Sequence, residues 1–229
     1  MRAIILKEFL KIKIAFLAFL GFVIFDLIAI VANALHQFNQ SGKSEVIFGI
    51  NYGFEFSFLW LDVLNIFFAV ILGFFCYYRE KIGGRLRLHF HFPLSNLKQV
   101  LIITALPLCF LIFVFLIEFI VLFGFFCVVF PLNLSLNLIN LLINNFAFCV
   151  VLFFAPFGII FSSKFSEIAL NIVSWSVLVF LYFKINPDLV SFTSYSQNDK
   201  FYVFFAFCLV FSYTNLQVVI KKYKQGYLK

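Results

Sequence analysis

Six long apolar runs constrain what this chain can fold into more than any other feature. An α-helix needs about 20 apolar residues to cross the hydrocarbon core of a bilayer. The runs cover residues 14–35, 58–78, 100–123, 138–161, 168–185 and 201–220. Helices satisfy their own backbone hydrogen bonds, which lipid cannot do. The sequence therefore predicts an all-α integral membrane protein, a bundle of six transmembrane helices forming a single transmembrane domain over residues 1–229.

The composition leaves little chain for anything outside a membrane. Hydrophobic residues make up 64% of the sequence, charged residues make up 12%, and the mean hydropathy is +1.09. Ordinary soluble chains carry about 25% charged residues. No polar stretch is long enough to bury a core of its own, so we expect no folded soluble domain.

The basic residues are distributed unevenly between the ends of the apolar runs. Fourteen of the 17 Lys and Arg residues lie before the first run, between the second and third, near residue 164, or after the last. Loops on the cytoplasmic side carry the excess of Lys and Arg. The pattern predicts six spans with both termini cytoplasmic, and the basic charge is explained without a nucleic-acid partner.

The first and third apolar runs have features of their own. Residues 1–13 place Lys7, Lys11 and Lys13 among apolar residues at helical spacing, which predicts an amphipathic helix in the membrane interface. The following run is longer than the 7–15 residues of a signal-peptide core, so we interpret it as an uncleaved span. The third run extends to Phe130, too long for one perpendicular crossing, so it must tilt, kink at Pro107, or end in a surface segment.

A polar, cation-rich segment at 79–99 separates the second and third runs. Its apolar residues recur at i, i+4, i+7, i+8 and i+11, as in an amphipathic helix. They are Leu86, Phe90, Pro93, Leu94 and Leu97. We interpret the segment as a short helix at the membrane surface with a polar face open to a partner. The alternative is a solvated basic loop that only obeys the charge rule.

This segment resembles the first cytoplasmic loop of permeases of the type-two ABC exporter family. The matching positions are Glu80, Gly84, Leu86, Leu88, Pro93, Leu94 and Ser95, and with Phe90 they make up the predicted ATPase-coupling residues. Two positions depart from the family pattern: Arg85 replaces a Thr, and Arg87 replaces a Glu. The second change reverses a charge that would contact the ATPase.

The resemblance implies a transmembrane permease subunit of an ATP-binding cassette exporter-like complex. In such a complex this chain pairs with a second copy or a homologue, and two cytoplasmic ABC ATPase subunits dock below. The segment Glu80 to Ser95 would then be the coupling helix. ATP would bind at the partner subunit, this chain would bind no cofactor and would not be an enzyme, and the location would be a bacterial inner membrane.

Three acids fall within the apolar runs. Asp26 lies in the first, Glu118 in the third, and Asp62 near the outer end of the second. A charge at the bilayer centre costs about 2.5–3.5 kcal/mol on the insertion scale, so such residues face the bundle interior or a partner. Asp26 and Glu118 are the candidates for lining a translocation path, whereas Asp62 can reach the interface. They leave open a proton- or cation-coupled carrier or channel, or a non-transporting membrane anchor subunit.

Other chemistry finds little support in the sequence. The five cysteines lie in or beside apolar runs, and none forms a C-x-x-C pair. Buried cysteine usually acts as a small hydrophobe. His89 and His91 lack a third ligand nearby, so we expect no metal site. No H-E-x-x-H, G-x-S-x-G or complete phosphate-binding loop is present in the sequence.

Overall fold

The described part of the chain is helical throughout. The computed structural model describes residues 2–48, 60–82, 96–162, 164–185 and 199–224. Within these ranges, the side chains that it leaves undescribed are those of residues 2–12, 96–102, 199–200 and 223–224. Helices and no strands occur among the described residues. The predicted all-α class is confirmed for this part of the chain.

Eight helices follow one another along the described ranges. They are α1 (Arg2–Ser41), α2 (Lys43–Phe48), α3 (Leu61–Lys81), α5 (Asn96–Val129), α6 (Leu132–Leu152), α7 (Ala155–Phe161), α8 (Phe165–Ile185) and α9 (Asp199–Lys224). Six described segments are long and apolar enough to cross a membrane: Lys13–Ser41, Leu61–Lys81, Ile103–Val129, Leu132–Phe161, Phe165–Ile185 and Phe201–Lys222. This set fits a multi-pass membrane protein.

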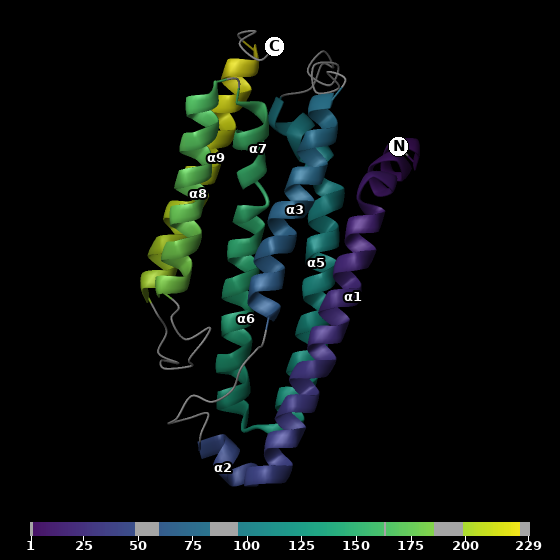
Figure 1. Ribbon diagram of the computed structural model, residues 1–229, viewed down its shortest axis with the longest axis vertical. Coiled ribbons are helices and arrows are strands. Elements are labelled where there is room, and N and C mark those ends of the chain that lie inside the picture. Colours follow the sequence, from purple (N-terminus) through teal and green to yellow (C-terminus); the bar gives the residue numbers. More distant parts are fainter. Residues whose placement is uncertain (1, 49–59, 83–95, 163, 186–198, 225–229) are drawn as a thin grey trace.

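The long helices run alternately up and down in an elongated bundle, and Figure 1 shows both termini at the same end. Helix α3 lies in the middle, where it packs against α1, α5, α6 and α7. Helices α8 and α9 pack against each other and against α7. Because α3 contacts these four helices, polar side chains on it can reach partners on each of them.

Helix α1 is one continuous helix of 40 residues. At 1.5 Å per residue it is about 60 Å long, twice the roughly 30 Å of a hydrocarbon core. It ends at Ser41 and is followed by Gly42, whose φ of +84° is the left-handed conformation that terminates many helices. The helix thus passes without a break from the predicted interfacial segment 1–13 into the first span and beyond its expected end at residue 35. The interfacial role of 1–13 stays a prediction.

Helix α5 continues through Pro107 for 34 residues without interruption. Its length is about 50 Å, which exceeds the hydrocarbon thickness. A separate surface segment at the end of the third apolar run is therefore absent from the described residues, since the helix runs on to Val129. In a membrane of ordinary thickness, α5 must tilt or project from it.

The fourth span is broken in two, which the sequence analysis did not anticipate. Helix α6 ends at Leu152 and α7 begins at Ala155, with Pro156 in its first turn. Proline has no N–H, so the carbonyl of Leu152 cannot receive the usual bond from four residues ahead. The backbone N–H of Phe153 still bonds to the carbonyl of Cys149 at 2.9 Å, and this bond closes α6.

Gly73 of α3 packs directly against this break. A Cβ added at Gly73 would overlap the backbone oxygen of Phe153 and lie 3.2 Å from Cγ of Pro156. Small residues let membrane helices approach closely where no hydrophobic force between them is available. Glycine at this position therefore permits α3 to contact the junction of α6 and α7 through its backbone.

Aromatic rings fill much of the interior between the helices. Phe19 of α1 stacks on Phe68 of α3 with ring centroids 3.6 Å apart, and Phe148 of α6 stacks on Tyr182 of α8 at 4.2 Å. Many other large apolar side chains point outward, among them Phe25 on α1. Such outward apolar side chains suit contact with lipid.

Candidate functional site

The acids predicted inside the membrane are brought together in the bundle. Asp26, Asp62 and Glu118 come from α1, α3 and α5, and their exposed fractions are 5%, 6% and 0%. The carboxyl groups of Asp26 and Asp62 are close enough to Glu118 to interact with it electrostatically. Asp62, predicted near the outer end of its span, lies in the first turn of α3 and is buried together with the two candidate path residues.

Glu118 is held by an amide from the neighbouring helix. Nδ2 of Asn65 on α3 donates to Oε2 of Glu118 at 2.9 Å, and both residues are buried. The other carboxyl oxygen, Oε1, has no hydrogen-bond partner among the described residues. Asp26 is similar: the backbone N–H of Trp60 bonds to its carboxylate, while Oδ2 is unpartnered among the described residues.

Asn145 of α6 links the same region to two further helices. Its Nδ2 lies 3.4 Å from the backbone oxygen of Asp62 and 3.2 Å from the hydroxyl oxygen of Tyr182 on α8. Its Oδ1 accepts from the thiol of Cys149 at 3.6 Å. Together these contacts join α3, α6 and α8, so the polar cluster (Asp26, Asp62, Asn65, Glu118, Asn145, Cys149 and Tyr182) extends across five helices.

The sequence analysis identified the acids but not their partners. Asn65 and Asn145 lie within apolar runs and repeat at helical spacing with a second polar residue: Asp62 and Asn65 are three apart, and Asn145 and Cys149 are four apart. Residues at these spacings share a helix face. Buried carboxamides in membrane helices are costly unless they are hydrogen-bonded, so this spacing was an available signal.

A small cavity of about 10 Å³ opens beside Glu118. Its polar lining comes from Glu118, Asn65 and Cys149, and the remaining walls are aromatic and aliphatic. This volume is roughly that needed to hold one water molecule. The polar cluster thus includes a space the size of one water molecule, and Glu118, whose Oε1 has no hydrogen-bond partner among the described residues, is one of the residues that line it.

The cluster contains no compensating positive charge. Among residues whose burial the structure describes, the buried charged side chains are all acidic, and no Lys or Arg is buried. The described residues also contain no group of three or more His, Cys, Asp or Glu placed to hold a metal ion. The three carboxyl groups are therefore neighbours in the bundle without converging on one metal position.

The predicted ATPase-coupling residues lie mostly outside the described residues. These are Gly84, Leu86, Leu88, Phe90, Pro93, Leu94 and Ser95. Only Glu80, near the end of α3, is described, and it is fully buried. The adjacent Lys81 donates from Nζ to the backbone oxygen of Ile160 in α7 at 2.6 Å. The start of the segment is thus fastened to the bundle on the α7 side.

The same end of the bundle is tied together at α8 and α9. Nζ of Lys222 lies 2.6 Å from Oε1 of Glu167. Between α7, α8 and α9 there is a groove of about 340 Å³ that includes both residues together with Ser162 and Asn171. The ion pair and the Lys81 contact therefore connect α3, α7, α8 and α9 near the predicted coupling segment.

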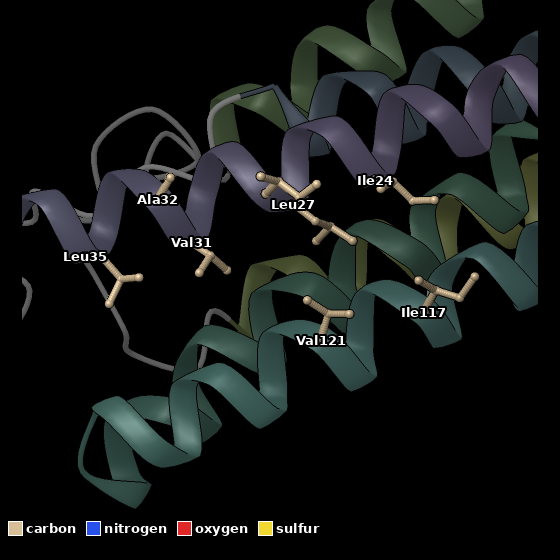
Figure 2. Close-up of a pocket in the computed structure, with 8 residues that line it drawn as sticks. Ile24, Leu27, Val31, Ala32, Leu35, Ile117 and Val121 are labelled. Carbon is tan, nitrogen blue, oxygen red and sulfur yellow. The ribbon is translucent and has the colours of Figure 1, made fainter.

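A second groove, of about 370 Å³, runs between α1 and α5 and is purely apolar. Figure 2 shows the aliphatic side chains of α1 facing Ile117 and Val121 of α5 across it. The groove offers a ligand no hydrogen-bond partner. It suits lipid tails or an apolar helix and adds no chemistry to the polar cluster.

Comparisons of the chain with family models, with curated proteins and with solved structures found no match. The class that the fold defines is therefore that of a helical protein with six segments able to cross a membrane.

Proposed function

We propose that this chain is the transmembrane permease subunit of an ABC exporter-like complex in a bacterial inner membrane. It would move an unidentified substrate with energy from separate cytoplasmic ATPase subunits, and it would pair with a second copy or a homologue. The chain itself would hydrolyse no ATP. The observation that carries the proposal is the resemblance of residues Glu80 to Ser95 to the coupling loop of that family.

The surroundings of this segment support the proposal. Helix α3 ends at Lys81 and α5 begins at Asn96, so the segment joins two helices at the end of the bundle that also holds both termini (Figure 1). The described basic residues at this end include Lys13, Arg79 and Lys222, as a cytoplasmic face would require.

The fixed contacts next to the segment suggest how a movement would be transmitted. Lys81 bonds to the last turn of α7, and α7 packs against α8 and α9. A partner that displaced the segment would therefore pull on α7, whose connection to α6 is already broken at Phe153. We expect α7 to move as a rigid unit between α3 and α8. Closure of the ATPase subunits on nucleotide would drive this movement and change how the helices of the bundle pack.

The polar cluster favours the second candidate, a proton- or cation-coupled carrier. Three buried carboxyl groups lie together there, and such groups commonly mark ion or proton pathways. This carrier would transport without an ATPase. It therefore predicts that activity survives changes to residues 80–95 and is lost when Asp26 is changed to Asn.

Purification in mild detergent tests the proposal. We expect a protein with a phosphate-binding loop to co-purify with the wild-type chain and to be lost from the double variant Glu80→Ala, Leu86→Asp. The first change removes the leading acid of the family pattern. An acidic residue at Leu86 would place a charge on the apolar stripe that holds the helix at the membrane surface, so the polar face would no longer be presented to the ATPase.

A matched control separates this effect from general damage. Leu132 is exposed at the start of α6, at the opposite end of the bundle. Leu132→Asp should retain the ATPase. Absence of any ATPase from the wild-type preparation, or equal recovery with the double variant, would refute the coupling assignment.

A further inference from the structure

The arrangement at Glu118 distinguishes its two carboxyl oxygens. Oε2 accepts a hydrogen bond from Nδ2 of Asn65 at 2.9 Å, whereas Oε1 has no partner among the described residues. An amide N–H can only donate, so the oxygen that it contacts must be an acceptor. If the carboxyl group is protonated, Oε2 is its carbonyl oxygen and the proton sits on Oε1.

The cavity supplies a place for that proton to go. Glu118, Asn65 and Cys149 border a space of about 10 Å³ among apolar side chains. A space of this volume holds one water. The side chain of Glu118 is 0% exposed, so it must turn slightly before a water there can accept a hydrogen bond from Oε1. An organic cation does not fit, and the described residues do not assemble a metal site. The ligand that suits the space is therefore a proton carried with one water.

The neighbouring groups explain why a proton would be held there. The titratable groups around Glu118 are Asp26 from α1, Asp62 from α3 and Cys149 from α6, with Tyr182 of α8 joined through Asn145. None of these groups supplies a positive charge. An ionised Glu118 would lie near two other carboxyl groups in a water-poor interior, where repulsion and lost hydration both oppose it. Uptake of a proton removes that charge.

We propose that Glu118 is a proton-binding site within the membrane bundle, with Asn65 as its hydrogen-bond donor and the cavity water as its exchange partner. On release, the O–H bond at Oε1 breaks, the proton passes to the water, and a carboxylate remains. The reverse transfer restores the acid. The site does not depend on an ATPase, and it applies to either class of transporter.

Infrared spectroscopy of the chain in lipid nanodiscs tests this site, because protonated carboxylic acids absorb apart from carboxylates. We expect a protonated-carboxyl absorption near neutral pH that shifts in D2O and disappears at alkaline pH. Glu118→Gln should remove one component of it and leave any component from the buried Asp26 and Asp62. The Gln side chain keeps the shape and can still accept from Asn65. Glu167→Gln is the control, because Glu167 is half-buried and paired with Lys222, and its spectrum should retain the band.

A second variant keeps the test decisive if Glu118→Gln does not fold. In Asn65→Leu the carboxyl group remains but loses its donor to Oε2, so the band should move to higher frequency with its intensity retained. A purely structural acid would give a band that resists both D2O and alkaline pH. That result, or a band unchanged in Glu118→Gln, would overturn the proposal.

Discussion

Replacing Gly73 with alanine is expected to destabilise the bundle by about 1–3 kcal/mol, the usual cost of overpacking a tight interior. The added methyl group would overlap the backbone oxygen of Phe153 and crowd Pro156. Backbone cannot rotate away as a side chain can, so α3 must separate from the junction of α6 and α7. Titration with SDS, followed by the fluorescence of Trp60 and Trp175, would measure the change in the free energy of unfolding.

Two other glycines provide matched controls. A Cβ added at Gly124 of α5 has no neighbour within 4 Å, so Gly124→Ala should be neutral or slightly stabilising. At Gly158 the added Cβ would meet the side chain of Asn215, which can rotate, so that variant should fall between the two. Equal stabilities for Gly73→Ala and Gly124→Ala would contradict the close packing of α3 on the helix break.

Asn65→Leu is expected to cost about 1–3 kcal/mol, the penalty for leaving a buried polar group without its partner. Glu118 is fully buried, and Asn65 supplies the one hydrogen bond that its carboxyl group receives from a described side chain. The double variant Asn65→Leu, Glu118→Leu should recover most of that loss, because replacing both partners by apolar groups of similar size can be nearly neutral.

The same SDS titration gives the coupling between the two positions. The double variant should be destabilised by less than the sum of the two single variants, since the residues are in direct contact. Asn171→Leu serves for comparison, because Asn171 is also buried but bonds to Ser162 and to backbone oxygens at the end of α7 and in the first turn of α8. Additive effects of Asn65→Leu and Glu118→Leu would show that the hydrogen bond contributes nothing measurable.

The helical class and the six apolar segments follow from the sequence because long apolar runs have few other solutions in lipid. The division of the fourth span into α6 and α7 is harder to predict from the sequence. Pro156 lies within that run, but proline is tolerated inside membrane helices, as Pro107 in α5 demonstrates. What differs at Pro156 is the neighbour: α3 presents Gly73 to the break, and that contact joins residues far apart in the chain.

Part of the polar cluster could also be predicted from the sequence. Asp26 and Glu118 stand out because an acid in an apolar run is costly, and the structure places both in the interior. Which acids meet depends on how three helices pack, so the inclusion of Asp62 could not be deduced. Asn145 was overlooked because a neutral carboxamide carries a weaker signal, although its bonds connect α3, α6 and α8.

Site-specific photocrosslinking would test the central proposal most directly. A photoreactive amino acid placed at Arg87, on the polar face of the coupling segment, reports what that position touches in the cell. We expect a crosslink to a protein with a phosphate-binding loop, and none from the same probe at Leu132, which is exposed at the opposite end. If the probe at position 87 crosslinks only to lipid, or if both positions capture the same proteins, this chain is not the permease subunit of an ABC exporter-like complex.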